Sequence, residues 1–194
     1  MSKIIAISGF ARSGKDTAFK IMEDYLQLNE GWSFQRVAFA DALKSHLYPL
    51  VSNKLGIDLY NCSDSEKELI RPLMVEYGKA HRSLDGEYWV KESFKDLDIS
   101  ESSKVVYVVT DLRYENERLL LKKLCKESNA TFSHLHLNRI GFKEGNQEEL
   151  EFTAPLEEKS DISLSWVSMV DYSEQEQEQL KINYAEFFSK EVII

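Results

Sequence analysis

Short apolar runs alternate along the chain with longer segments in which apolar residues recur every three or four positions. The runs are brief and rich in β-branched residues, as expected for strands of a parallel sheet that is covered on both faces. They lie at residues 3–8, 34–39, 104–109, 131–137 and 161–167. Because these runs alternate with helical segments, the pattern predicts an α/β fold built on a parallel five-stranded sheet with right-handed crossovers.

The segments with helical periodicity predict six helices. Capping-box sequences, in which a serine is followed three residues later by glutamate, mark two of the helix starts: SDSE at 63–66 and SEQE at 173–176. We expect the helices at residues 16–28, 40–55, 63–82, 87–94, after the strand at 104–109, and from 173 to about 189.

Two of these helices contain a proline, which removes a backbone hydrogen bond and crowds the preceding turn. Pro49 is therefore expected to bend or interrupt the second helix, and Pro72 the third. In the helix that follows residue 109, we assign the apolar side to Leu119, Leu120 and Leu124.

Composition narrows the class of protein. The 194 residues suit a single domain, and the net charge of −9 argues against a partner that is a nucleic-acid polymer or an anionic membrane. No apolar run approaches the ~18 residues of a membrane span. The two cysteines, Cys62 and Cys125, form neither a disulfide framework nor a zinc motif, which favours a reducing cytosol. A local basic pocket for a phosphorylated small molecule remains compatible with this composition.

A glycine-rich loop follows the first strand. Residues 9–15 read GFARSGK and fit the pattern G-x-x-x-x-G-K, with a strand directly before them and a helix directly after. In such a loop the backbone N–H groups surround phosphate oxygens, the helix dipole favours the negative charge, and the lysine meets the β- and γ-phosphates. The loop therefore predicts a phosphate-binding site.

The residue after the loop lysine departs from the usual pattern. Asp16 stands where Ser or Thr normally binds Mg²⁺, and Thr17 comes one position later. A carboxylate can hold Mg²⁺ directly or through water. The alternative is that Asp16 is a first-turn acid that complements the helix dipole, and the sequence leaves both readings open.

Four segments in the same order carry a family resemblance. The string ISGFARSGKDT at 7–17 resembles the start of the bacteriophage deoxynucleoside monophosphate kinases. FADALK at 39–44, GEYWVK at 86–91 and VVTDLRYENE at 108–117 resemble further segments of that family. Animal phosphomevalonate kinases share the framework, and KELIRPLM at 67–74 resembles a segment of theirs.

The resemblance covers most of residues 1–138 and implies a P-loop kinase. It implies an α/β fold in one domain, with a helical acceptor-binding region at about 40–96 and a lid at about 139–158. The implied reaction is ATP- and Mg²⁺-dependent phosphoryl transfer to a (deoxy)nucleoside monophosphate in the cytoplasm, that of the host if the gene is a phage gene. The alternatives are a phosphomevalonate-type kinase or a degenerate nucleotide-binding regulatory module, and a homodimer is left open.

Two departures from the phage family concern the later part of the chain. Residues 148–152 lack the histidine of its H-x-S/T-E motif, and residues 166–168 stand where the family has an N-D-G turn. These differences put the base specificity and the full activity in question.

The resemblance also implies roles for individual residues. The expected ATP contacts are Gly9, Ala11, Arg12, Ser13, Gly14, Lys15, Asp16, Thr17 and Arg139. The expected metal ligands are Asp16, Thr17 and Asp111. The expected catalytic residues are Lys15, Asp111, Arg113 and Arg12. The expected acceptor contacts are Asp41, Lys44, Lys67, Arg71, Arg82, Trp89 and Arg113.

Several of these residues also have a structural interpretation. Asp111 and Asp41 each stand where a helix N-cap is possible. Arg71 and Arg82 share one helix face, where they are either phosphate clamps or part of a solvated charged stripe. Trp89 is more often a core residue than a base-stacking one.

The predicted lid at 139–158 is acidic. Its cations are Arg139 and Lys143, and its glutamates are at positions 144, 148, 149, 151, 157 and 158. We expect only Arg139 and Lys143 to contact nucleotide phosphate. The glutamates are expected to face solvent or to pair with basic residues such as Arg82. The segment is expected to be the most mobile part of the chain, with Gly141 and Gly145 as hinges.

Overall fold

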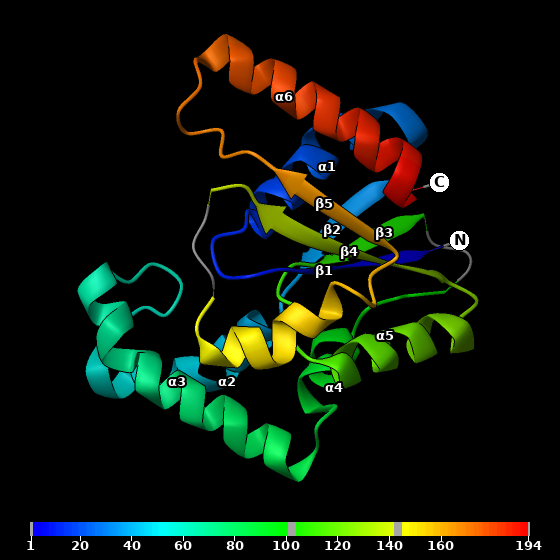
Figure 1. Ribbon diagram of the computed structural model, residues 1–194. Helices are drawn as coiled ribbons and strands as arrows, with labels where there is room; N and C mark the ends of the chain where they lie inside the picture. Colours follow the sequence, from blue (N-terminus) through cyan, green and yellow to red (C-terminus); the bar gives the residue numbers. More distant parts are fainter. Residues whose placement is uncertain (1, 101–103, 142–144, 194) are drawn as a thin grey trace. The chain divides into compact units, whose positions relative to one another are not determined.

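The structure, a computed structural model, describes residues 2–100, 104–141 and 145–193, without the side chains of 27–30. The chain divides into two compact units (Figure 1). We call residues 1–37 and 98–194 the α/β unit and residues 38–97 the helical unit.

The α/β unit is built on a parallel sheet of five strands, which confirms the predicted fold class. The strands are β1 (Lys3–Ser8), β2 (Ser33–Val37), β3 (Val105–Val109), β4 (Thr131–Arg139) and β5 (Ile162–Trp166). Their spatial order is β2-β3-β1-β4-β5, so the first strand lies at the centre and pairs with β3 on one side and β4 on the other. Every residue of β1 is buried, which explains its apolar run.

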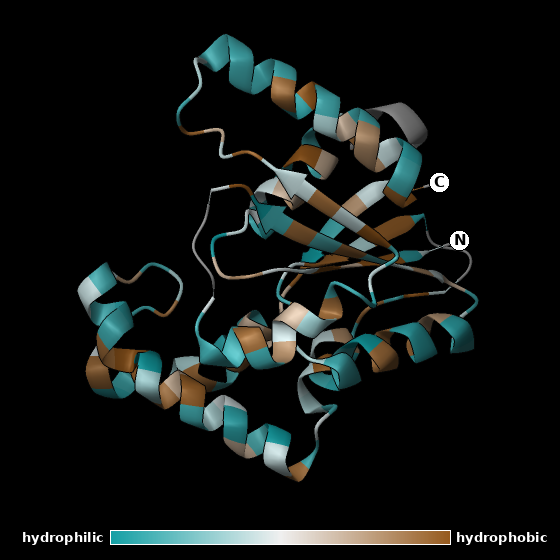
Figure 2. Cartoon of the chain, viewed as in Figure 1, coloured by the Kyte–Doolittle hydropathy of each residue, from teal (hydrophilic) through white to brown (hydrophobic). Residues whose placement is uncertain are grey.

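Helices cover both faces of this sheet. Figure 1 shows α1 and α6 on one side and α5 on the other. The helices are α1 (Lys15–Glu30), α5 (Glu115–Glu127) and α6 (Glu174–Phe187), with short turns η1 (Glu149–Thr153), η2 (Ala154–Leu156) and η3 (Phe188–Ile193). Figure 2 shows apolar residues along the strands and a mixture of apolar and hydrophilic residues along α5 and α6, as expected for helices that cover a sheet on one side and face solvent on the other.

The apolar side of α5 differs from the prediction. Leu120, Leu121 and Cys125 are buried, whereas Leu119 is 52% exposed. Successive helical residues point about 100° apart, so three consecutive leucines span about 200° and cannot all face the sheet. The prediction placed Leu119 on the wrong side.

The helical unit contains α2 (Phe39–Leu55), α3 (Asp64–Leu84) and α4 (Tyr88–Phe94). Both α2 and α3 run through their prolines without a break, contrary to the expected interruption. Pro49 and Pro72 are exposed, as are Ser45 and Glu68, which stand one turn earlier. Each carbonyl that loses its partner therefore belongs to an exposed turn, where water can replace the missing hydrogen bond.

Aromatic rings form the centre of the helical unit. The His81 ring stacks on Tyr88 at 4.3 Å, and Trp89 lies against both rings. The indole N–H of Trp89 donates to the carbonyl of Gly78 at 3.2 Å. A Cβ atom at Gly78 would lie 2.9 Å from Leu43, so the absence of a side chain there lets α2 pack closely on α3.

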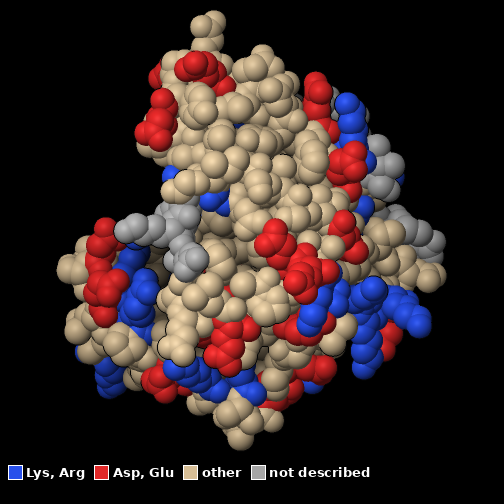
Figure 3. Space-filling view, viewed as in Figure 1, with Lys and Arg blue, Asp and Glu red and all other residues tan. Residues whose placement is uncertain are grey.

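Charged side chains of both signs are visible on the surface of the protein (Figure 3). On the face seen in Figure 3, Lys and Arg side chains are interspersed with Asp and Glu. Within the described ranges, none of the helices has both the length and the apolar character that crossing a bilayer requires.

Candidate functional site

The loop between β1 and α1 requires both of its glycines. Gly9 has φ 139° and Gly14 has φ 93°, values that side-chain-bearing residues rarely adopt. A Cβ atom at Gly9 would lie 2.3 Å from the carbonyl oxygen of Leu137, and one at Gly14 would lie 2.4 Å from the Trp166 ring. The loop is thus a tight turn of backbone amides at the start of α1, the geometry that binds phosphate.

Lys15 is the charged centre of this loop. Its ammonium donates to the carbonyls of Gly9 at 2.8 Å and Phe10 at 2.9 Å. Burial is the main reason why the pKa of Lys15 falls to about 8, and the nearby positive charge of Arg113 lowers it further. Three carboxylates act in the opposite direction: those of Glu149, Asp111 and Asp16. The fold therefore brings charged groups from three segments, the start of α1, the end of β3 and η1, into the electrostatic neighbourhood of one lysine.

Asp111 and Arg113 come from the carboxyl end of β3, beside the loop. Strands β1 and β3 are neighbours, with Ala6 opposite Val109. Helix α5 begins at Glu115 with Tyr114 as its N-cap, so the helix-capping interpretation of Asp111 is wrong. The carboxyl end of parallel strands is where open α/β sheets bind ligands.

Asp16 has a partner on the neighbouring chain segment. Its carboxylate accepts a hydrogen bond from Nε of Arg36, at the end of β2, over 2.8 Å. The side chain of Asp16 is 73% exposed, and Thr17 is exposed as well. The side-chain oxygens of Asp16 and Thr17 therefore lie at the first turn of α1, where they are accessible to solvent and ligands.

Arg139 and Trp166 contact the loop from the ends of β4 and β5. Arg139 donates to the carbonyl of Arg12 at 3.2 Å and to the hydroxyl of Ser168 at 2.6 Å. The indole N–H of Trp166 donates to the carbonyl of Ser13 at 2.7 Å, and its ring lies over Gly14. Sequence reasoning assigned no role to Trp166, although its place at the end of the last strand was a signal.

Replacing Trp166 with phenylalanine keeps an aromatic ring in the core but removes the N–H donor, leaving the buried Ser13 carbonyl without this bond. We expect the free energy of unfolding to fall by about 1–3 kcal/mol, the typical cost of an unsatisfied buried group. Urea denaturation measures it. Trp32→Phe is the matched control, since Trp32 packs against the same core and is only partly buried. An equal loss in both variants would mean that ring volume, not the hydrogen bond, matters at Trp166.

One glutamate of the predicted lid contradicts the expected exposure, whereas Glu148, Glu151, Glu157 and Glu158 are exposed. Glu149 is 6% exposed, and its Oε1 accepts a hydrogen bond from the backbone N–H of Ala11, within the loop, at 2.6 Å. A turn that presents backbone amides attracts a carboxylate for the same electrostatic reason that it attracts phosphate. Of the other lid residues named above, Lys143 and Glu144 lie outside the described residues.

The predicted acceptor contacts of the helical unit are mostly paired with acids on their own helix. Lys44 lies 3.3 Å from Asp41, which stands in the first turn of α2; the helix is capped by Ala38, so the N-cap interpretation of Asp41 is wrong. On α3, the ion pairs one turn apart are Lys67–Asp64 at 3.2 Å, Arg71–Glu68 at 3.6 Å and Lys79–Glu76 at 3.3 Å. These exposed pairs match the solvated-stripe interpretation, and the acceptor roles of Lys67 and Arg71 stay predictions.

Two further acceptor contacts are buried to different extents. Arg82 is half-buried on α3. Trp89 is 2% exposed and packs within the helical unit, so it can support the surrounding helices but offers no open ring for stacking. This corrects its assignment as an acceptor contact.

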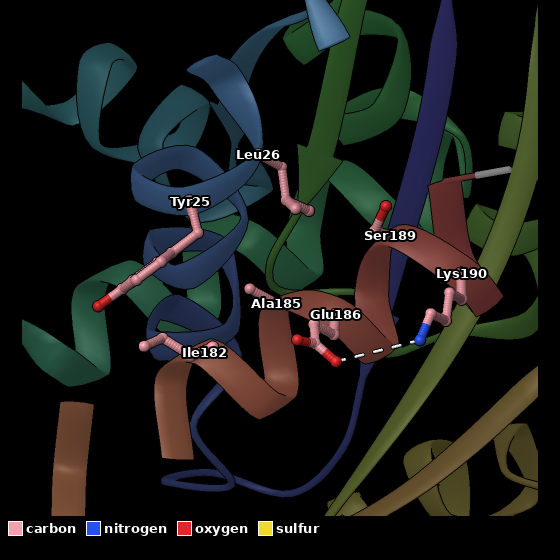
Figure 4. A pocket seen from close by; sticks show the side chains of 7 residues that line it. All are labelled: Tyr25, Leu26, Ile182, Ala185, Glu186, Ser189 and Lys190. Atoms are coloured by element: carbon pink, nitrogen blue, oxygen red, sulfur yellow. Dashed lines mark ion pairs between the residues drawn. The ribbon is translucent and has the colours of Figure 1, made fainter. Parts of the chain in front are cut away.

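A cavity of about 510 Å³ lies elsewhere in the α/β unit, between α1 and the C-terminal helices (Figure 4). Its walls include the apolar side chains of Leu26 and Ile182, and the Lys190 ammonium lies 4.0 Å from the Glu186 carboxylate. This cavity lies between helices rather than at the loop between β1 and α1.

Comparison with known proteins supports the fold. A candidate kinase from Chloroflexus aurantiacus matches over 98% of this chain and 98% of its own, with a TM-score of 0.50 and 11% identity. Kti12 from Chaetomium thermophilum, in complex with ADP-AlF3, matches over 97% and 99%, with a TM-score of 0.45 and 14% identity. Thymidylate kinase from Ehrlichia chaffeensis matches over 97% and 98%, with a TM-score of 0.40 and 11% identity.

Matches at such low identity show the fold alone. The chain has an α/β fold with a five-stranded parallel sheet flanked by helices, similar to the fold of the Chloroflexus aurantiacus protein. No protein-family model matches the chain, and no curated protein does.

Proposed function

We propose that the protein transfers the γ-phosphoryl group of ATP to a (deoxy)nucleoside monophosphate and so produces the diphosphate. The observation that carries this proposal is the convergence on Lys15: a phosphate-type loop at the start of α1, with Asp111 and Arg113 at the end of the adjacent strand. The resemblance of residues 7–17 and 108–117 to the phage kinases supports a nucleoside monophosphate as the acceptor, although it indicates a small-molecule phosphate kinase more strongly than it indicates the acceptor. A phosphomevalonate-type acceptor is the alternative.

In this proposal the protein contributes positioning and charge neutralisation, without a covalent intermediate. The loop amides and Lys15 hold the β- and γ-phosphates. Arg12 and Arg113 neutralise charge on the acceptor phosphate and the transferring group. Arg139, which already contacts the Arg12 carbonyl, lies beside the nucleotide.

The oxygen donors near the loop fit Mg²⁺. In the described part of the chain, His, Cys, Asp and Glu form no group of three or more that could enclose a metal ion. Mg²⁺ is usually bound through one or two carboxylates together with phosphate oxygens and water. Asp111 together with Asp16 or Thr17 would therefore supply enough ligands from the protein. When bound, Mg²⁺ would neutralise charge on the phosphates. Asp16 would exchange part of its contact with Arg36 for this role.

A panel of the common dNMPs and NMPs, each with ATP and Mg²⁺, tests the proposal. We expect ADP to form with at least one monophosphate at a rate well above the ATPase background. Phosphomevalonate belongs in the same panel, and activity with it alone would select the alternative acceptor. ADP formation at background with every acceptor would overturn the kinase assignment.

A nucleotide-binding module that does not transfer phosphate is the second candidate. The divergent acidic lid favours it, because residues 148–152 lack the histidine of the phage family's H-x-S/T-E motif. ATP binding by calorimetry, combined with failure of every acceptor in the panel, would support this second function.

A further inference from the structure

The segment 145–156, which we call the acidic segment, is docked against the loop and the start of α5. Glu149 accepts from the Ala11 amide, and the neighbouring Glu148 accepts from the Tyr114 hydroxyl at 2.6 Å. The ring of Phe152 lies 5.2 Å from that of Tyr114. Three contacts from one short segment therefore converge on the region where Lys15 and Arg113 lie.

The two oxygens of Glu149 have separate partners. Oε2 accepts from the backbone N–H of Asn146 at 3.2 Å, while the side chain of Asn146 accepts from the Glu149 amide at 3.0 Å. This reciprocal pair is a capping box, which fixes the direction of the glutamate side chain. Oε1 is left to reach Ala11, so the geometry of the acidic segment aims one carboxylate oxygen into the loop.

We propose that Glu149 is an internal anion that occupies the phosphate loop and must be displaced before a nucleotide binds. A backbone N–H has one hydrogen, so the Ala11 amide cannot serve Glu149 and a phosphate oxygen fully at once. The negative charge of Glu149 also adds repulsion toward a polyphosphate beside Lys15. This inference rests on the proposed function in one respect only: the natural ligand of the loop carries phosphate.

The internal anion sets the apparent affinity. A site that is open for only a fraction of the time binds its ligand more weakly by that same fraction. If Glu149 occupies the loop for roughly 90–99% of the time, its removal tightens ligand binding roughly 10- to 100-fold. Binding of nucleotide in turn frees the acidic segment from the loop.

The test compares ATP and inorganic tripolyphosphate binding, measured by calorimetry without acceptor, in the intact protein and in variants. Glu149→Gln keeps the capping box, for which glutamine is also suited, but removes the charge. Glu149→Asp keeps the charge but shortens the reach by one methylene group. Glu151→Gln is the matched control, since Glu151 is exposed in the same segment.

We expect both Glu149 variants to bind the two probes at least 10-fold more tightly than the intact protein, and Glu151→Gln to bind as the intact protein does. Affinities that are equal to or weaker than that of the intact protein in both Glu149 variants would overturn the inference while leaving the proposed function standing. Absence of binding in every protein would overturn both. Unfolding midpoints, measured alongside, confirm that each variant is folded at the assay temperature.

Discussion

Lys15→Ala should lower kcat/KM for phosphoryl transfer by roughly 10²-fold or more, with the fold intact. The ammonium is half-buried against the loop carbonyls, and its pKa of about 8 leaves it mostly protonated at pH 7. The charge is therefore already in position, and no reorganisation of solvent is needed when phosphate binds. The measurement is steady-state kinetics with the acceptor that the panel identifies, together with far-UV circular dichroism.

Lys20→Ala is the control for that experiment. Lys20 lies on the same helix, but it is exposed, and its ion pairs among the described residues are with the neighbouring acids Glu23 and Asp24. Its replacement should leave kcat/KM within about twofold, since exposed ion pairs contribute little. A folded Lys15→Ala protein with unchanged turnover would show that the loop plays no part in the reaction.

Acidification from pH 6.5 to pH 4 should cost the protein roughly 3 kcal/mol of stability through His134 alone. His134 is fully buried, and burial lowers its pKa to about 4. In the unfolded chain the imidazole takes up a proton below about pH 6.5, whereas in the folded chain it stays neutral until the pH falls to about 4. The stabilisation is thus fully present above pH 6.5 and is lost as the pH falls through this window. Burial also lowers the pKa of His136, so this residue changes the stability in the same direction.

The structural reason for this dependence is a buried hydrogen-bond network directly before the phosphate loop. The Ser8 hydroxyl lies 2.8 Å from Nε2 of His134 and 2.8 Å from Nδ1 of His136. One hydroxyl hydrogen can serve only one of these rings, so the other ring must donate to the Ser8 oxygen. Urea denaturation at several pH values measures the effect, and in His134→Gln the slope between pH 6.5 and 4 should be smaller. An unfolding free energy that is equal at pH 7 and pH 5 in the intact protein would contradict the prediction.

The strands, the loop and most helix boundaries were predictable because each depends on local pattern. The apolar run at 3–8 is a strand that is buried throughout, and the capping box at 63–66 starts α3 as expected. The errors are also local in origin. The spacing of the apolar residues is compatible with Leu119 on either the buried or the exposed side of α5. The two prolines are tolerated because the carbonyls that they leave without a partner belong to exposed turns, and the periodicity of the sequence does not encode this.

The site was less predictable because its contacts join distant segments. The glycine loop can be recognised from its sequence pattern, but nothing in the composition of residues 145–156 indicates that one of several glutamates contacts the loop. Likewise the contact of Trp166 with Ser13, and that of Asp16 with Arg36, depend on the order of strands in the sheet. Charge counting along the chain treated all lid glutamates alike, whereas the reciprocal bonds with Asn146 single out Glu149.

The central position of β1 has a consequence for synthesis of the chain. Its two neighbours in the sheet, β3 and β4, are made about a hundred or more residues later, and the indole that donates to Ser13 is 153 residues away along the chain. Ribosomes add residues at roughly 5–20 per second, so the nascent loop spends several seconds without its supports. During that interval it has neither the strand pairing nor the closing tryptophan, and these long-range pairings are the slow ones to form. The loop therefore gains its complete set of supports only after most of the α/β unit has been synthesised.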